Sequence, residues 1–310
     1  MKRVLVTGAS GYIGRCSLSP LLDRDFEVHA VAGHTPVESD ARVIWHIADL
    51  LDKKSAAQLC DDIRPTHLLH FAWYVNPADY KTSPENARWV EATQRLLRAF
   101  KNCGGTRIAV AGTCMEYDWS LPQEKFSETA SPALPTNPYG IAKDNVRREA
   151  DAFVKVNGLS LAWGRIFFSY GLHEAKTRLV PSVILSLLHG QEALCTSGEK
   201  IRDFLYVEDM GEAFAALLES DVVDVVNIAS GRSLAIKDIV LSIAEYIGRP
   251  DLVRLGARPT PANEPSRIVA DISRLKNEVG WQPQYTLKEG LNKTISWWKE
   301  NRAQDRYSLQ

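Results

Sequence analysis

Closely spaced cysteines are missing from this chain of 310 residues. Its cysteines are odd in number, and no two of them stand in a CxxC pattern. A disulfide framework or a zinc site would need paired or clustered cysteines, so we expect neither a disulfide nor a bound metal. Unpaired cysteines are typical of a reducing compartment, and we therefore expect a cytoplasmic protein. They are Cys16, Cys60, Cys103, Cys114 and Cys195.

An excess of positive charge and long apolar runs are missing as well. The net charge is near -1, so we expect no nucleic-acid partner. The first apolar run, Val4 to Val6, is too short for a signal sequence or a membrane span, and we expect a chain that is intact from its first residue and has no membrane contact. With 45% apolar and 24% charged residues, the chain is of the globular class and long enough for one large domain or one and a half.

Short apolar runs alternate with amphipathic segments through the first half of the chain. Several of the apolar runs are apolar on both faces, which is typical of a parallel sheet covered by helices. This alternation predicts an α/β fold with a Rossmann-like, doubly wound parallel sheet. The expected strands are residues 3–7, 27–32, 43–47, 67–71, 107–111 and 160–165, and the expected helices are residues 12–22, 54–61, 88–100 and 143–156.

The pattern loosens after about Ser169, where prolines and glycines separate shorter elements. We predict a dinucleotide-binding domain in residues 1–168 and a smaller C-terminal α/β lobe, residues 169–310, that mainly binds the substrate. The chain is expected to return to the first domain near residues 208–230, since Asp224 to Ile228 reads as a further strand.

The strongest local motif is Val4-Leu-Val-Thr-Gly-Ala-Ser-Gly-Tyr-Ile-Gly14. A strand runs into three glycines and a helix follows, so backbone N–H groups and the helix dipole face one anion. The spacing is GxxGxxG, and the missing side chains let a pyrophosphate approach closely. A turn that needs glycine for packing alone is the alternative. The expected cofactor-binding residues of this loop are Gly8, Ser10, Gly11, Tyr12, Ile13 and Gly14.

An acid is missing where the second strand ends, at Val31-Ala-Gly-His34. NAD sites usually hold the ribose hydroxyls with such an acid, whereas His34 and Arg15 offer positive charge to a 2′-phosphate. This favours NADP(H) over NAD, unless both residues are only solvated surface residues. Asp49 and Leu50, after the third strand, are expected to contact the adenine; alternatively, Asp49 caps the next helix.

Pro138-Tyr-Gly-Ile-Ala-Lys143 places a tyrosine and a lysine four residues apart on one helix face. We expect the Lys143 ammonium to lie near the Tyr139 phenol and to lower its pKa, so that the phenol exchanges a proton near neutral pH. Such a pair alone is common. Here it follows a glycine loop and a strand that ends at Thr113, and this combination is specific.

Together these motifs resemble the extended short-chain dehydrogenase/reductases of the NAD-dependent epimerase/dehydratase family, which act on nucleotide sugars. The resemblance covers nearly the whole chain, and its segments follow in family order. They are the glycine loop, Asp49-Leu50, His70-Phe-Ala-Trp73, Thr113, Tyr139 with Lys143, Arg165 to Gly171, Arg202 to Asp209 and Leu275 to Pro283.

The resemblance implies that Tyr139 is the catalytic acid/base, that Lys143 binds the nicotinamide ribose and that Thr113 hydrogen-bonds the reacting sugar oxygen. It implies that the nucleotide sugar lies under the C-terminal lobe and that a homodimer forms through helices 88–100 and 143–156. Arg202 would bind the diphosphate; an ion pair of Arg202 with Asp203 or Glu208 is the structural alternative. The cofactor is expected to lie against Phe71, Ala72 and Trp73.

Departures from the family pattern limit the reaction. Dehydratases carry an Asp-Glu pair directly after the threonine, where this chain has Cys114 and Met115, so 4,6-dehydration is disfavoured. In GDP-fucose synthases the catalytic cysteine lies two residues after the hydroxyl position rather than one, which favours a packing role for Cys114. Phe168 stands where an asparagine is usual, and His173 is either a second acid/base or a substrate contact. We expect Trp73, Cys114, Met115, Phe168, His173 and Arg202 to line the substrate pocket.

We therefore predict NADPH-dependent reduction of the carbon-4 ketone of a nucleotide-linked 4-keto-6-deoxyhexose, with Tyr139 as the proton donor. A net reductase exchanges its cofactor at each turnover, and the acid-free second strand favours NADPH, so reduction is preferred. The alternatives are a nucleotide-sugar 4-epimerase with tightly bound NAD and, from a different class, a non-catalytic NADP-binding protein.

Overall fold

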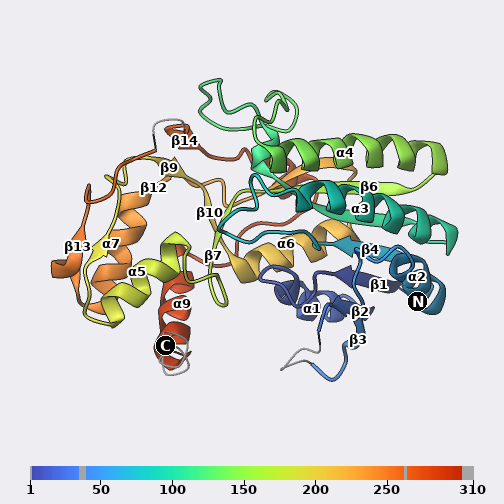
Figure 1. Ribbon diagram of the computed structural model, residues 1–310, viewed down its shortest axis with the longest axis horizontal. Coiled ribbons are helices and arrows are strands. Elements are labelled where there is room, and N and C mark those ends of the chain that lie inside the picture. Colours follow the sequence, from blue (N-terminus) through green and yellow to red (C-terminus); the bar gives the residue numbers. More distant parts are fainter. Residues whose placement is uncertain (1, 35–39, 262–263, 302–310) are drawn as a thin grey trace.

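The computed structural model describes residues 2–34, 40–261 and 264–301. Its centre is a parallel sheet of seven strands in the order β11-β6-β5-β4-β1-β2-β3 (Figure 1). This is the order of a dinucleotide-binding sheet with the last strand taken from far along the chain. The strands are β1 (Lys2–Thr7), β2 (Phe26–Ala32), β3 (Ile44–Ile47), β4 (His67–His70), β5 (Arg107–Thr113), β6 (Ser160–Ile166) and β11 (Asp224–Ile228).

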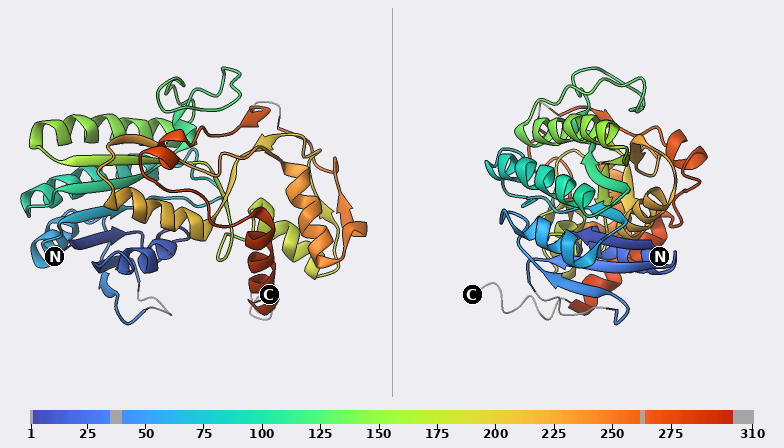
Figure 2. Two further views of the ribbon diagram at one scale, coloured as in Figure 1. Left: turned by 180° about the vertical axis from the view of Figure 1, so that it is seen from behind. Right: turned by 90° about the vertical axis from the view of Figure 1, so that its right-hand side faces the viewer.

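Helices cover both faces of this sheet (Figure 2). α2 (Ser55–Ile63), α3 (Glu85–Asn102) and α4 (Pro138–Asn157) lie on one face, and α1 (Gly14–Leu22) and α6 (Val207–Glu219) lie on the other. Successive side chains of a strand point to opposite faces. Val4 and Val6 therefore enter the core beneath α1 and α6, whereas Leu5 enters the core beneath α2, α3 and α4.

A smaller lobe lies beyond the carboxyl ends of the sheet strands, at the left of Figure 1. Its helices α5 (Leu179–Leu188), α7 (Ile236–Ile247) and α9 (Leu287–Asn301) enclose a separate apolar core. The remaining elements are short: β7 (Phe168–Tyr170), β8 (Ala193–Leu194), β9 (Ile201–Arg202), β10 (Phe204–Tyr206), β12 (Leu234–Ala235), β13 (Val253–Arg254), β14 (Arg267–Ile268), α8 (Ser273–Asn277) and the 3-10 turns Cys114–Glu116 and Pro250–Leu252.

The predicted α/β fold with a Rossmann-like parallel sheet is confirmed. The chain does return to this sheet late, because β11 pairs in parallel with β6. The division into a cofactor domain, residues 1–168, and a nucleotide-sugar lobe, residues 169–310, concerns what each part binds and stays a prediction. Within the described ranges, no helix has both the length and the apolar character to cross a membrane.

The helix that carries Tyr139 begins earlier than its apolar periodicity predicts, at Pro138 instead of Lys143. The Asn137 side chain accepts a hydrogen bond from the Gly140 N–H at 2.9 Å and caps the first turn. Proline at the first helical position lacks an N–H that the helix could not have used. Because of this early start, Tyr139 and Lys143 lie on one helical face of α4.

Candidate active site

The glycine loop forms a cradle at the start of α1. Gly8 takes a left-handed φ of 67° as the chain leaves β1. A Cβ atom on Gly14 would lie 2.2 Å from the Gly8 carbonyl oxygen, and one on Gly8 would lie 2.7 Å from the Ala72 nitrogen. No side chain caps α1 at Ile13, and the Arg15 and Cys16 N–H groups donate to the Gly11 and Ile13 carbonyls. The close approach that the glycines allow and the positive end of the helix dipole fit the pyrophosphate of a dinucleotide.

The three residues after β4 take different positions. Ala72 lies against the glycine loop at Gly8. The Phe71 ring points into the core on the α6 side, with its centroid 4.8 Å from that of Phe214. Trp73 is buried beside α4, where its ring lies 3.8 Å from the Lys143 ammonium. The structure thus brings Ala72 and Trp73 to the predicted cofactor cleft and places Phe71 beneath it.

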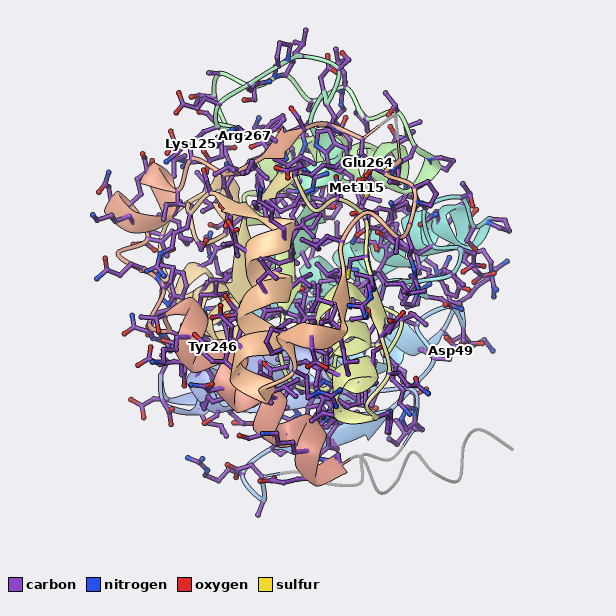
Figure 3. The ribbon with its side chains drawn as sticks, turned by 90° about the vertical axis from the view of Figure 1, so that its left-hand side faces the viewer. Asp49, Met115, Lys125, Tyr246, Glu264 and Arg267 are labelled. Carbon is purple, nitrogen blue, oxygen red and sulfur yellow. The ribbon has the colours of Figure 1, made fainter. Side chains whose placement is uncertain are left out.

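Two basic residues predicted at the cofactor are exposed. His34 follows β2, whereas Arg15 lies in the first turn of α1, where its guanidinium donates to the Ser10 carbonyl at 2.8 Å. Asp49 does not cap α2, because Asp52 accepts the Lys54 N–H at the start of that helix. The Asp49 carboxylate instead accepts a hydrogen bond from the Leu51 N–H at 2.9 Å, at an exposed edge of the molecule (Figure 3). The alternative cap role of Asp49 is therefore wrong, and its adenine contact stays a prediction.

Thr113 and Tyr139 are brought together by a close contact between two elements. Thr113 ends β5, and its hydroxyl accepts the Met115 N–H at 3.2 Å as the chain turns. The first turn of α4 packs on this turn so closely that a Cβ atom on Gly140 would lie 2.5 Å from the Met115 carbonyl oxygen. Burial raises the pKa of Tyr139 well above its usual value, and the nearby Thr113 hydroxyl lowers it to a smaller extent. Tyr139 is therefore a neutral phenol beside a second hydroxyl.

Lys143 is buried one helical turn further along α4. Its Nζ donates to the Ala111 carbonyl at 3.0 Å. Burial lowers the pKa of Lys143 to about 7, and the carboxylate of Glu116 opposes this shift. We expected the ammonium to lower the pKa of Tyr139, and the expectation is wrong for the direction of the shift. Burial of the phenol outweighs the lysine charge, because desolvation of a fully buried group is the larger effect.

Aromatic rings surround Tyr139. The Tyr80 ring meets the Tyr139 ring edge-on, with the centroids 5.0 Å apart. The Trp73 ring lies 6.4 Å from the Tyr139 ring and donates its Nε1–H to Asn86 at 2.9 Å. Arg178, at the start of α5, lies over the Tyr80 ring at 5.3 Å. Trp73, Tyr80 and Tyr139, called the aromatic wall below, make one side of the site apolar.

Two residues predicted in the substrate pocket lie together in the structure. The Arg202 guanidinium lies 5.4 Å from the Phe168 ring centroid. Cys114 packs in the same apolar cluster as Phe168, and burial raises the pKa of its thiol to about 12. The thiol is therefore protonated at neutral pH, in line with the packing role that its position in the sequence favoured.

Arg202 forms an ion pair with a residue that the sequence did not indicate. Its Nη2 lies 3.3 Å from the carboxylate of Glu264, which also pairs with Lys200 at 3.3 Å. In Figure 3 Glu264 lies in the same upper part of the molecule as Met115. Asp203 accepts hydrogen bonds from Ser230 and Gly231 instead, so the predicted alternative pairing of Arg202 is wrong. Arg202 is buried, whereas Glu264 is exposed enough to move aside.

The segment after β7 lies against the lobe. His173 has a left-handed φ of 61°, and its ring packs against Trp297 of α9 at 4.6 Å. Its role as a second acid/base or a substrate contact stays a prediction. Its neighbour Glu174 points inward: burial raises the pKa of its carboxyl to about 8, and Oε2 has no hydrogen-bond partner among the described residues.

Sequence reasoning missed two residues of the site. Glu116 is fully buried directly below Thr113, and the spacing Thr113-Cys-Met-Glu116 was the available signal, because it is a capping box. Tyr80 had no such signal. It lies in an irregular loop with no periodic pattern, and only the packing of that loop on α4 brings its ring to Tyr139.

The comparisons with known proteins agree with this arrangement. Residues 4–229 match the model of the NAD dependent epimerase/dehydratase family. UDP-glucuronic acid decarboxylase 1 of Xenopus tropicalis is 26% identical over 320 residues, which cover 99% of this chain and 75% of that protein. The dTDP-glucose 4,6-dehydratase of Haemophilus influenzae is 24% identical over 336 residues, with 97% of this chain and 99% of that protein covered.

A solved structure shows the same fold. The UDP-glucose 4-epimerase of Thermotoga maritima, crystallised with UDP-glucose, superposes with a TM-score of 0.87 at 23% identity, covering 97% of this chain and 99% of its own. The matched region includes the glycine cradle, Thr113, Tyr139 and Lys143. The chain belongs to the NAD-dependent epimerase/dehydratase family.

Proposed function

We propose that this protein uses NADPH to reduce the carbon-4 ketone of a nucleotide-linked 4-keto-6-deoxyhexose. The observation that carries the proposal is the end of β2, where the exposed His34 follows the strand in place of the acid that usually holds the ribose of NAD. A net reductase exchanges its cofactor at each turnover and draws on NADPH. The neutral phenol of Tyr139, beside Thr113, is the proton donor that such a reduction needs.

Tyr139, Thr113 and Lys143 each have a separate role in this reaction. A bound NADPH supplies the hydride that reaches carbon 4. The Tyr139 hydroxyl gives its proton to the carbonyl oxygen, while the Thr113 hydroxyl donates a hydrogen bond to the negative charge that develops there. The positive charge of Lys143 stabilises the phenolate that Tyr139 becomes.

The residues after Thr113 argue against elimination of water. A 4,6-dehydratase needs a proton acceptor and a proton donor beside carbons 5 and 6. Met115 has no ionisable group, and the Cys114 thiol, with a pKa raised to about 12 by burial, gives up no proton near neutrality. The aromatic wall suits a sugar edge that has already lost a hydroxyl, because an apolar surface leaves a buried hydroxyl unpaired.

The nucleotide is expected to bind between the lobe and the loop after β5. Arg202 exchanges its contact with Glu264 for the diphosphate, since both partners are anions. A groove lined by residues 119–124 and 265–267 opens near these groups. Trp119 of this groove donates its Nε1–H to the Cys114 carbonyl at 3.0 Å, which connects the groove to the catalytic turn. We assign the nucleobase to this groove.

The cofactor preference rests on two exposed basic residues, His34 after β2 and Arg15 in the first turn of α1. NADPH is expected to bind more tightly than NADH, because these residues face its 2′-phosphate. His34→Asp places an acid where NAD sites have one, so the preference should shift toward NADH by about tenfold or more. Fluorescence titration of both cofactors against both proteins measures the shift. A clear NADH preference of the wild type would contradict the assignment.

The decisive assay follows absorbance of the reduced nicotinamide in the presence of dTDP-, CDP-, GDP- and UDP-4-keto-6-deoxyhexoses. Stoichiometric loss of NADPH with one of them identifies the reductase and its nucleotide. The same triad would serve a 4-epimerase. Tightly bound NAD and interconversion of intact nucleotide hexoses, without net oxidation of NADPH, would establish that reaction and overturn the proposal. Cofactor binding with no turnover of either kind would indicate the non-catalytic alternative.

A further inference from the structure

Glu116 is a fully buried carboxylate whose hydrogen bonds all go to the floor of the active site. It is 0% exposed and lies at the end of the turn that begins at Thr113. Oε1 accepts the Thr113 backbone N–H at 2.8 Å and the Trp163 indole N–H at 2.9 Å. Oε2 accepts from the Arg165 Nε at 2.7 Å. A single side chain thus joins the catalytic turn to two residues of β6.

The neighbouring residues leave room for this carboxylate and balance its charge. A Cβ atom on Gly112 would lie 2.1 Å from the Trp163 Nε1 and 2.7 Å from the Glu116 Oε1, so only glycine fits there. The buried Arg165 guanidinium compensates the charge and stacks over the Tyr117 ring at 4.2 Å. A buried ion pair with every partner in place fixes geometry more than it adds stability.

The charge of Glu116 also reaches the catalytic groups. Burial drives the pKa of Lys143 down, and Glu116 is the carboxylate that acts against this. It also raises the pKa of Tyr139 and of Cys114. The other titratable group that faces Lys143 from a neighbouring strand is His70 on β4, which burial holds neutral by lowering its pKa to about 3. Glu116 is therefore the negative charge that supports the ammonium.

We propose that Glu116 is a positioning residue of the active site: its hydrogen bond to the Thr113 N–H holds the turn that carries the Thr113 hydroxyl, and its charge lies at the same end of β5 that Lys143 binds through the Ala111 carbonyl. This inference deepens the proposed reductase and rests on it for the role of Thr113. It assigns a task to a fully buried residue that acts through its neighbours. The role has two parts. The charge of Glu116 is tested by the pH dependence of cofactor affinity, and its geometry is tested by turnover.

The charge part is tested without any sugar substrate, by titrating cofactor fluorescence across pH. The variant Glu116→Gln keeps the size of the side chain and removes the charge. We expect the pH at which affinity falls, near 7 in the wild type, to move down by about one unit, because the Lys143 ammonium loses its counter-charge. NADH is used beside NADPH, since the 2′-phosphate of NADPH ionises in the same pH range.

Two control variants show which group causes the pH transition of cofactor affinity. Lys143→Met should abolish the transition if Lys143 causes it. A transition caused by Glu174, whose pKa burial raises to about 8, would persist in that variant. Glu128→Gln removes another largely buried carboxylate that also accepts a backbone N–H, from Asn227 at 2.8 Å, and should leave the transition in place. An unshifted transition in Glu116→Gln, or a wild-type affinity that does not change with pH, would overturn the charge part.

The geometric part is tested by a double-mutant cycle on turnover. Glu116→Asp keeps the charge and shortens the reach, so kcat should fall about tenfold or more while the pH transition stays in place. The same substitution made in Thr113→Ala should cost little further, because it acts through that hydroxyl. If Glu116→Asp lowers kcat by the same factor in the wild type and in Thr113→Ala, the positioning role is overturned.

The two proposals fail in different ways. Should the wild type reduce no 4-keto sugar, the proposed function falls, and the pH transition of cofactor binding still tests Glu116. If the wild type is an epimerase, the double-mutant cycle is measured on the rate of epimerisation instead. If Glu116→Gln does not fold, both parts are tested with Glu116→Asp. Native turnover in that variant would overturn the geometric part. A shift in the pH transition of its cofactor affinity would overturn the charge part.

Discussion

At the scale of single residues, the site depends on two buried groups whose pKa values are shifted from their usual range. Tyr139 is a buried phenol with a raised pKa, and Lys143 is a buried amine with a pKa lowered to about 7. Burial is the larger cause in both, so each group is shifted toward its neutral form. The two shifts make separate predictions, one for turnover and one for stability.

Loss of the Tyr139 hydroxyl should remove turnover and leave the fold intact. Tyr139→Phe keeps the ring that packs against Tyr80 and Trp73, so cofactor affinity and thermal midpoint should stay close to those of the wild type. Without the proton donor, kcat should fall by about two to four orders of magnitude. The matched control is Tyr80→Phe, which removes a hydroxyl from the adjoining ring and should retain most activity. A Tyr139→Phe protein with native turnover would refute the mechanism.

Removal of the buried lysine should stabilise the protein while it destroys activity. Lys143→Met avoids the cost of a buried ammonium, and we expect a gain of about 1–3 kcal/mol near pH 6. The wild-type lysine releases its proton near pH 7 when folded but only near 10.4 when unfolded, so the unfolded chain binds more protons between these values. Wild-type stability therefore rises with pH across this range, and the advantage of methionine shrinks.

Urea unfolding of both proteins from about pH 6 to about pH 9 measures this difference. Lys155→Met on the same helix is the control, because the side chain of that lysine is 68% exposed and pairs with Asp151. Lys155→Met should not increase the free energy of unfolding. If the difference in the free energy of unfolding between Lys143→Met and the wild type is constant over the whole pH range, Lys143 keeps its proton throughout that range.

At the scale of elements, glycines set how closely helices approach one another. Gly211 of α6 faces α1, and a Cβ atom there would lie 2.3 Å from the carbonyl carbon and oxygen of Cys16. Gly211→Ala must therefore push the two helices apart, at a cost of about 1–3 kcal/mol in the free energy of unfolding. Gly33→Ala is the control, since its Cβ would meet nothing within 4 Å. Chemical denaturation of both variants gives the comparison; equal midpoints would show that α1 adjusts freely.

Elements with a regular pattern were predictable from the sequence, and contacts between elements were not. The six strands and four helices that periodicity indicated are all present, with β11 as the expected late addition. The spacing of Tyr139 and Lys143 on α4 followed from helical geometry alone. The pKa direction of Tyr139 did not, because it depends on burial under Trp73 and Tyr80, and Tyr80 arrives from a loop without periodicity. The contact of the His173 ring with Trp297 was not predictable for the same reason, because it depends on the packing of α9.

At the scale of the whole molecule, the cofactor cradle and the lobe leave one helical face uncovered. α3 and α4 lie side by side on the outside of the sheet (Figures 1 and 2). The outward face of α4 carries exposed apolar side chains, with Ile141 42% and Val156 87% exposed and Ala152 between them. We predict that this face joins two copies of the chain in a symmetric dimer, in which each α3–α4 pair packs on the other.

The dimer prediction is tested by a charge placed at the centre of this face. Ala152→Arg adds a long cation where a symmetric interface would bring two copies of the same residue close together, so the dimer should dissociate. Light scattering should then fall from twice the chain mass to 34.6 kDa. Leu241→Arg is the control, because it adds the same charge to α7 in the lobe, where Leu241 is 37% exposed. Both variants should keep the wild-type thermal midpoint at low concentration. If the wild type already scatters as a single chain, the α3–α4 face is not a stable interface, and turnover per chain should then not change on dilution.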